Sequence, residues 1–303
     1  ILALVKDLKA FAFNEADSEY FFNIKHDRST GDVALLMTPL NGGELMNKVL
    51  FSRVPVVIAS ATIKVGENLD VFAQKIGNLK HSDFEQLCVA SPFNYKENSK
   101  FYIPANALGA KEEGYDKYCQ EEMKRLVTLS RGRAFLLFTS KTTLEAYYKV
   151  LAPYFQKLGY QCFKQGDADR LTLIEKFKKS PNGVLFGGDS FWEGVDIPGR
   201  TLCNVIMQKI PFDTPNPISQ AKEALVSAAG RDAFVECQVF PAIIKFKQGV
   251  GRLIRKTTDG GIITLLDGRV FLKKNFGKYF IQALPDGMGK TVNFEDLAPF
   301  VAE

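Results

Sequence analysis

The feature that most constrains the fold of this chain is a regular alternation of short apolar runs and amphipathic helical patterns after residue 133. The runs that have the composition of buried strands are Ala134–Phe138, Tyr160–Phe163, Gly183–Phe186, Leu202–Met207 and Gly261–Leu266. Helical patterns lie between most of them, at 141–158, 169–179, 216–228 and 238–254. Strands that alternate with helices at this spacing are typical of a parallel sheet with helices on both faces. The sequence therefore predicts an α/β fold.

The N-terminal residues have a different pattern. Residues 1–12 place apolar side chains at helical spacing and predict an amphipathic helix. Residues 19–24 and 32–37 flank a polar turn and predict a β-hairpin, which a short helix at 42–51 follows. The β-branched run Pro55–Ser60 has the composition of a buried parallel strand.

This change of pattern predicts two domains. We place the boundary near Lys64–Glu67, which separates a small piece at residues 1–65 from one α/β domain at residues 66–303. Residues 78–132 hold a weakly patterned stretch and then one long helical pattern at 114–129. The chain does not begin with Met and shows no signal-peptide pattern, so we expect it to start within a larger protein.

The cysteines, histidines and charge narrow the range of functions. No two of the five cysteines lie within thirty positions of each other, which excludes the usual spacing of metal ligands and favours reduced thiols in a cytoplasmic protein. The two histidines, His26 and His81, lie in polar stretches and argue against a Ser–His mechanism. A net charge of +5 permits a polyanionic partner. No run approaches the roughly 20 apolar residues that span a bilayer.

Four segments of the sequence have patterns that suggest a function. Two of them carry hydroxyl groups directly after predicted strands. Ser60 and Thr62 follow the run at 55–60, and Thr139 and Ser140 end the strand that begins at Ala134. Ligands of doubly wound sheets collect at the carboxyl ends of strands, and hydroxyl groups at helix N-termini attract phosphates. The alternatives are a simple turn at Ser60 and an ordinary helix N-cap at Ser140.

The third segment is the glycine-rich stretch at residues 187–199, which follows the predicted strand Gly183–Phe186. Its glycines favour sharp turns or close approach to a ligand. Asp196 is suited to accept a hydrogen bond from a ribose hydroxyl, and Trp192 to pack beneath the loop or to stack on a base. The alternative is a structural connection rich in left-handed conformations.

The fourth segment, residues 248–255, reads Gln-Gly-Val-Gly-Arg-Leu-Ile-Arg. Within a continuous helix, Gln248, Arg252 and Arg255 would share one face. The two glycines each cost about 1 kcal/mol in a helix interior, which is explained if a phosphate or another backbone comes close. Guanidinium groups match phosphate oxygens. The alternative is a solvated basic stripe.

These segments resemble a known family. The stretches Ser-Ala-Thr-Ile, Phe-Thr-Ser-Lys, Phe-Trp-Glu-Gly-Val-Asp-Ile-Pro-Gly and Gln-Gly-Val-Gly-Arg-Leu-Ile-Arg resemble motifs III, IV, V and VI of superfamily 2 helicases, in the XPD/DinG branch and in the expected order. Residues 207–218 resemble the stretch after motif V, and residues 39–51 the end of the arch region of bacterial DinG-like proteins. The resemblance covers residues 32–275. It implies a RecA-like motor domain 2, with an arch remnant and the last strand of motor domain 1 before it.

The resemblance also implies roles for individual residues. The expected catalytic residues, two arginine fingers and the glutamine beside them, are Arg252, Arg255 and Gln248. The residues expected to face the nucleotide and its ribose are Glu193, Gly194 and Asp196. The residues expected to hold the backbone of single-stranded DNA are Thr139, Ser140, Asp189 and Trp192. Those expected to couple the state of ATP to cleft opening are Ser60 and Thr62.

Two motifs of the family do not occur in this sequence. The nearest match to a phosphate-binding loop is Gly287–Thr291, which lacks the first glycine and a preceding strand, and which we interpret as a turn in the tail. No DEAH-type box is present. The resemblance therefore implies that motor domain 1 of the same protein binds most of the ATP and Mg²⁺, and that any iron–sulfur cluster lies outside this chain.

The leading hypothesis is the C-terminal motor domain of an ATP-dependent DNA helicase that moves 5′ to 3′ on single-stranded DNA and hydrolyses no ATP alone. A second hypothesis is a non-enzymatic RecA-like module that binds single-stranded DNA or a protein. A nuclease is a third, which the lack of clustered carboxylates disfavours.

Overall fold

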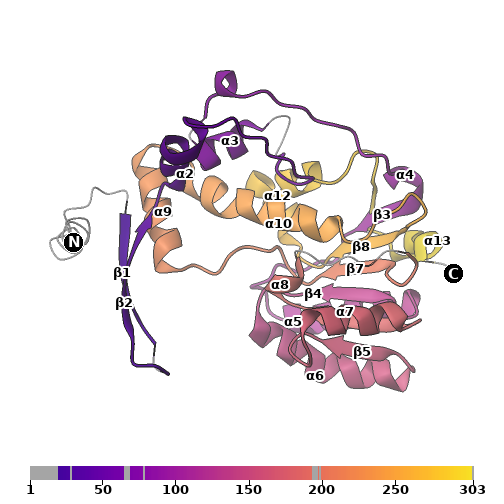
Figure 1. The fold of residues 1–303 in the computed structure, drawn as a ribbon. Coiled ribbons are helices and arrows are strands. Elements are labelled where there is room, and N and C mark those ends of the chain that lie inside the picture. Colours follow the sequence, from indigo (N-terminus) through magenta and orange to yellow (C-terminus); the bar gives the residue numbers. More distant parts are fainter. Residues whose placement is uncertain are drawn as a thin grey trace. The chain divides into compact units, whose positions relative to one another are not determined.

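The computed structural model describes residues 20–301 except 28, 65–68, 78, 193–196 and 198 (Figure 1). Contacts divide the chain into two compact units. The first comprises Ile1–Leu87 and Thr214–Phe240, and the second Cys88–Asp213 and Pro241–Glu303. We call them the hairpin unit and the sheet unit. The helix expected at residues 1–12 lies outside the described residues.

The sheet unit contains seven strands in the order β5-β6-β4-β7-β8-β3-β9, and every neighbouring pair is parallel. The strands are β3 (Ser99–Tyr102), β4 (Ala134–Leu137), β5 (Gln161–Lys164), β6 (Gly183–Gly187), β7 (Asn204–Met207), β8 (Gly261–Leu265) and β9 (Gly289–Thr291). The five strands predicted after residue 133 are confirmed. All residues of the inner strands β4, β6, β7 and β8 are buried, as expected for a parallel sheet covered on both faces.

Helices cover both faces of this sheet (Figure 1). They are α4 (Tyr95–Asn98), α5 (Tyr115–Leu129), α6 (Lys141–Lys157), α7 (Arg170–Lys179), α8 (Asp189–Trp192), α10 (Phe240–Val250), α11 (Arg269–Leu272), α12 (Lys274–Gln282) and α13 (Ala298–Val301), with the 3₁₀ turn η4 (Phe294–Leu297). Successive side chains of β4 point to opposite faces of the sheet. Phe138, just beyond it, packs on Tyr147 of α6, whereas Phe135 packs on Phe191 of α8.

The hairpin unit contains shorter elements. They are β1 (Tyr20–His26), β2 (Val33–Pro39), α2 (Gly42–Met46), the π-helix η1 (Asn47–Phe51), α3 (Asp70–Gly77), the 3₁₀ turn η2 (His81–Asp83), α9 (Pro217–Ala228) and the π-helix η3 (Val235–Val239). β1 and β2 form the predicted antiparallel hairpin. Asn47 donates to the carbonyl of Gly77 at 2.9 Å, which ties η1 to the end of α3.

The strand predicted at Pro55–Ser60 does not form. These residues have no regular structure and pair with no strand in the described part of the chain. Val57 is 96% exposed, so the run is not buried either. A strand requires a hydrogen-bonded neighbour, and the β-branched composition alone does not supply one.

The division between the two compact units falls after Leu87, and residues 214–240 belong to the first unit. β3 was not predicted, because its four residues follow a weakly patterned stretch. The turn predicted in the tail is present at Asp286 and Gly287, where the N–H of Met288 donates to the carbonyl of Pro285 at 3.1 Å, but Gly289–Thr291 forms the edge strand β9 beside β3. Which residues belong to the arch, motor domain 1 and motor domain 2 stays a prediction.

No helix in the described ranges is long and apolar enough to cross a membrane. All five cysteines are free thiols. Cys119 and Cys203 are buried, Cys162 and Cys237 are half-buried, and Cys88 is exposed.

Candidate functional site

The carboxyl ends of the inner strands bring three of the four predicted segments together. Trp192, the last residue of α8, donates its indole N–H to the carbonyl of Phe138 at 3.0 Å. The carbonyl of Trp192 accepts from Arg252, at 3.0 Å from Nε and 2.6 Å from Nη2. The segments at 138–141, 187–199 and 248–255 therefore meet at one residue, as expected for the ligand-binding edge of a doubly wound sheet.

The arginines do not lie on the helix that the sequence predicts. α10 ends at Val250, and Arg252 lies in a turn in which its N–H donates to the carbonyl of Gly249 at 3.1 Å. Gly249 and Gly251 have low helix propensity, so the helix ends where they cluster. The prediction that Gln248, Arg252 and Arg255 share one helix face is therefore wrong. Arg252 is nevertheless only 7% exposed.

Close packing explains why a glycine, which weakens a helix, occupies position 249. A Cβ atom there would lie 3.0 Å from Cζ3 of Trp192 and 2.6 Å from Cε of Met207. Real Cβ atoms are essentially never found at the second distance. A close approach was expected at this position, and the approaching group is an indole ring.

A buried carboxylate, which the sequence analysis missed, fixes the segment beyond the turn. Asp259 is 2% exposed, and its Oδ2 accepts from the backbone N–H groups of Arg255 and Lys256, both at 2.9 Å. Its Oδ1 accepts from the N–H of Gly199 at 3.1 Å. Asp259 thus joins the end of the glycine-rich loop to the arginine segment. Its position two residues before the strand Gly261–Leu265 was the available signal.

The other predicted catalytic residues lie beside this turn. Arg255 is half-buried. Gln248 is half-buried on the last turn of α10, and its Oε1 is a buried atom for which the described residues provide no hydrogen-bond partner. A buried acceptor without a partner is costly, which favours a ligand or water as its natural partner.

The hydroxyl groups predicted to hold DNA have different surroundings. Ser140 is the N-cap of α6: its Oγ accepts from the N–H of Thr143 at 3.1 Å. This is the structural alternative stated above for Ser140. Thr139 is half-buried, directly after the buried Phe138.

Trp192 is buried, with 1% of its surface exposed. Of the two interpretations of this side chain, packing beneath the loop is the one the structure favours, because a ring enclosed in this way offers no face to a base. The remaining predicted residues of the loop, Glu193, Gly194 and Asp196, lie outside the described residues. Asp189 begins α8, and we describe only its backbone.

Gln165 is a second residue that sequence reasoning missed. It follows β5, and its Oε1 accepts from the N–H of Gly188 at 2.6 Å while its Nε2 donates to Oγ of Ser190 at 3.1 Å. The side chain therefore fixes the start of the glycine-rich loop. A polar residue directly after the strand next to β6 was the available signal.

Ser60 and Thr62 belong to the hairpin unit and form only a local turn. The N–H of Thr62 donates to Oγ of Ser60 at 3.2 Å, and Ser60 is exposed. This is the simple turn that the sequence analysis kept as the alternative.

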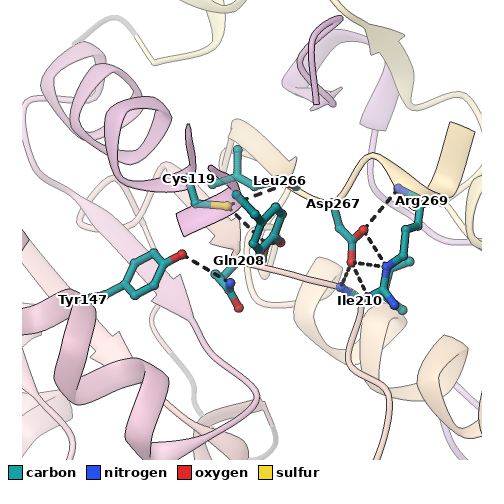
Figure 2. A network of polar contacts seen from close by, with 8 residues as sticks. Cys119, Tyr147, Gln208, Ile210, Leu266, Asp267 and Arg269 are labelled. Atoms are coloured by element: carbon teal, nitrogen blue, oxygen red, sulfur yellow. Dashed lines mark hydrogen bonds and ion pairs between the residues drawn. The ribbon is translucent and has the colours of Figure 1, made fainter. Parts of the chain in front are cut away.

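A buried polar network also lies at the ends of β7 and β8 (Figure 2). Asp267 is fully buried and accepts from the N–H of Ile210 at 3.1 Å and from Nη2 of Arg269 at 2.6 Å. The side-chain amide of Gln208 donates to the hydroxyl of Tyr147 at 3.4 Å. The Cys119 thiol donates to the backbone carbonyl of Gln208. Burial raises the pKa of Cys119 to about 12, so this thiol stays protonated. The network fixes the backbone just beyond two central strands.

Within the described ranges, no group of three or more His, Cys, Asp or Glu residues is arranged to hold a metal ion. β9, which contains the near match to a phosphate-binding loop, pairs with β3 in the sheet and leads into no helix of eight or more residues among those described. It therefore lacks the strand–loop–helix geometry of such a loop.

The parallel sheet with motif residues gathered at its carboxyl edge has the fold of a helicase motor domain. A solved XPD helicase is similar with a TM-score of 0.61 and 16% identity, over 95% of this chain and 50% of that chain. Residues 123–287 match the family described as the helicase C-terminal domain. The chain belongs to this family, in the DinG-like group of superfamily 2.

Three curated relatives illustrate the group. The ATP-dependent helicase DinG of Mycobacterium tuberculosis H37Rv is 32% identical over 83% of this chain and 38% of its own length. The ATP-dependent DNA helicase YoaA of Haemophilus influenzae is 34% identical over 76% of this chain and 35% of its length. The protein named 3'-5' exonuclease DinG of Bacillus subtilis is 29% identical over 97% of this chain and 32% of its length. The chain thus spans about a third of the length of each relative.

Proposed function

We propose that this chain is the C-terminal motor part of an ATP-dependent DNA helicase. It provides one wall of an ATP-binding cleft, and an N-terminal motor domain 1 of the same protein provides the other, with the phosphate-binding loop and the Mg²⁺ site. Membership of the helicase C-terminal domain family supports this assignment, as do relatives named as ATP-dependent helicases.

The observation that carries the proposal is the position of Arg252. Its guanidinium group is buried and bonded to the carbonyl of Trp192 at the carboxyl edge of the sheet, next to the segment that begins the glycine-rich loop. A guanidinium group held in one place costs little reorganisation when charge develops on a transferring phosphoryl group. Arginine fingers of this kind contribute about 10³–10⁵ to the rate of phosphoryl transfer.

The remaining residues of the site have supporting roles in this proposal. Arg255 is the second finger, and Gln248 orients the fingers or contacts the phosphates through its unpartnered Oε1. The residues that face the nucleotide and its ribose are Glu193, Gly194 and Asp196. When bound, ATP with Mg²⁺ supplies the phosphoryl group and its counter-charge, and motor domain 1 holds most of both.

Single-stranded DNA is the proposed polymer substrate. The segment Phe138–Ser140 and Asp189 lie at the carboxyl ends of β4 and β6, where they would contact the DNA backbone. Closure of the two motor domains on ATP and their release after hydrolysis would move the strand, in the 5′ to 3′ direction. Ser60 and Thr62 would couple the state of ATP to this movement.

The test compares two proteins: this chain alone, and the same chain joined to an N-terminal motor domain 1, which we call the two-domain protein. We expect no ATP hydrolysis above background from the chain alone, because it lacks a phosphate-binding loop. We expect turnover that rises with single-stranded DNA from the two-domain protein. Arg252→Ala should reduce this turnover by about 10³-fold or more.

The outcomes separate the candidate functions. Ordinary ATP turnover by the chain alone would mean that the catalytic halves are wrongly assigned. DNA-stimulated turnover that survives Arg252→Ala in the two-domain protein would favour the non-enzymatic RecA-like module, which binds single strands or a protein without contributing to hydrolysis.

A further inference from the structure

Trp192 makes three contacts that no other described residue of the site combines. Its indole N–H bonds to the carbonyl of Phe138, directly before the segment proposed to face DNA. Its own carbonyl bonds to the guanidinium group of Arg252. Its ring fills the space that the missing side chain of Gly249 leaves open. One residue thus touches motifs IV and VI while it belongs to motif V.

The contact with Arg252 constrains that side chain strongly. Two nitrogens of the same guanidinium group, Nε and Nη2, donate to one carbonyl oxygen, so Trp192 contributes to both the position and the plane of the group. A charge-assisted hydrogen bond in a buried place is stronger than a neutral bond in water. A displacement of the Trp192 backbone therefore displaces Arg252.

The contact with Phe138 constrains the other side. Phe138 is fully buried and packs on Tyr147 and Phe186, so its carbonyl lies at a fixed end of β4. A buried carbonyl that loses its donor is costly, and the segment that follows would shift to find another one. The next two residues are Thr139 and Ser140.

We propose that Trp192 is a positioning residue that links the segment facing DNA, Phe138–Ser140, to the arginine finger Arg252. This inference rests on the proposed function. Trp192 contacts neither DNA nor nucleotide in this proposal. It transmits a shift of Phe138–Ser140 through its indole and backbone to Arg252, which makes the orientation of the finger depend on DNA binding.

Gly249 is the second part of this link. A Cβ atom there would lie 2.6 Å from the flexible end of Met207 and 3.0 Å from Cζ3 of Trp192, so a larger residue moves the Met207 methyl group and displaces the ring by a few tenths of an ångström. We therefore expect Gly249→Ala to misplace Trp192 without removing any of its hydrogen-bonding groups.

The geometry can be tested in this chain alone, because Trp192 is its single tryptophan. The fluorescence of the chain should be that of a buried indole, poorly quenched by acrylamide. Gly249→Ala should shift the emission to longer wavelength and increase the quenching. Emission typical of a solvated indole in the unchanged chain, or no response to Gly249→Ala, would overturn the proposal.

The link itself is tested by kinetics of the two-domain protein. Trp192→Phe keeps an aromatic ring and the backbone carbonyl but removes the N–H that bonds to Phe138. We expect kcat at saturating single-stranded DNA to fall by about ten- to a hundredfold, the range in which small misplacements of catalytic groups act. The KM for ATP should not change, because Trp192 contacts no nucleotide in this proposal.

Ser130→Ala is the matched control. Ser130 is also fully buried and donates to a backbone carbonyl, that of Gly132 at 2.6 Å, but it precedes the amino end of β4. Ser130→Ala should lower the thermal stability of the two-domain protein without changing its kcat. If Trp192→Phe behaves like Ser130→Ala while Arg252→Ala abolishes turnover, the link is wrong and the proposed function stands. If Arg252→Ala has no effect, the proposed function fails.

Discussion

Two apolar runs of similar composition adopt different structures in this protein. Asn204–Met207 forms β7 in the centre of the sheet, where Val205 and Ile206 are fully buried. Pro55–Ser60 forms no strand, and Val57 is 96% exposed. β7 has β4 on one side and β8 on the other, whereas Pro55–Ser60 pairs with no described strand. An apolar, β-branched run is therefore only a candidate strand until a neighbouring strand bonds to it.

The same contrast applies to the polar groups of the two regions. In the sheet unit, just before β8, Asp259 bonds to three backbone N–H groups from two segments. In the hairpin unit, Ser60 bonds only within its own turn. Asp259 is thus bonded to a segment that is distant in sequence, whereas Ser60 is bonded only locally among the described residues. We therefore expect substitution of Asp259 to lower the free energy of unfolding more than substitution of Ser60.

The largest effect is expected from the buried run. Ile206→Ala removes a fully buried side chain from β7 and should lower the free energy of unfolding by about 2–5 kcal/mol, through lost apolar burial and the cavity left behind. Urea unfolding of the chain followed by circular dichroism measures the change.

A matched pair of valines provides the control for this prediction. Val205→Ala should destabilise the chain by about 2 kcal/mol, whereas Val57→Ala should change its stability by less than about 0.5 kcal/mol. Equal effects at the two valines would contradict the difference between the two runs.

A smaller effect is expected at Asp259. Asp259→Asn keeps the volume of the side chain but replaces one accepting oxygen with an amide donor, so the bonds to Gly199 and to Arg255 and Lys256 cannot all persist. Leaving buried backbone N–H groups without an acceptor should cost about 1–3 kcal/mol. Amide hydrogen exchange at these three positions should become faster.

Ser60→Ala is the control for Asp259→Asn. Because Ser60 is exposed and accepts only from its own turn, we expect its loss to change stability by less than about 0.5 kcal/mol. Unchanged exchange at Gly199, Arg255 and Lys256 in Asp259→Asn would show that the carboxylate does not hold the two segments together.

The smallest effect near neutral pH is expected from the buried thiols. Burial raises the pKa of Cys203, next to β7, to about 11 and that of Cys119 to about 12. In the unfolded chain both thiols titrate near pH 8.5. The stability they contribute is fully present below that pH and is lost as the pH rises toward about 11 to 12, because only the unfolded chain gains thiolates.

Unfolding midpoints measured at intervals between neutral pH and about pH 10 test this linkage. Cys203→Ala should reduce the decline of stability with pH. The same decline in Cys203→Ala and in the unchanged chain would contradict the prediction.

Much of the sheet could be predicted because four of its inner strands carry strong local signals. β4, β6, β7 and β8 are continuous apolar runs between helical patterns, and the structure confirms them. β3 could not be found in this way, since Ser99–Tyr102 is short and half polar in sequence. Its place depends on pairing with β8, more than 150 residues further along the chain, and local patterns carry no information about such a neighbour.

The candidate site was predictable in its segments but not in its geometry. The segments predicted at residues 138–141, 187–199 and 248–255 meet at Trp192. The helix predicted through residue 254 ends at Val250. The apolar 3.6-residue period continues to residue 254 in the sequence, but Gly249 and Gly251 favour the end of the helix. Asp259 and Gln165 were missed because their partners, Gly199 and Gly188, are distant in sequence.

One feature of the sheet has a consequence for how the protein behaves in concentrated solution. The edge strand β9 is only three residues long, and Lys290 at its centre is exposed. A long, flat edge would offer a row of free amide groups on which strands of other molecules could add, and a lysine on a short edge opposes such addition. The strand that mimics a phosphate-binding loop in sequence thus protects this side of the sheet from intermolecular β-pairing.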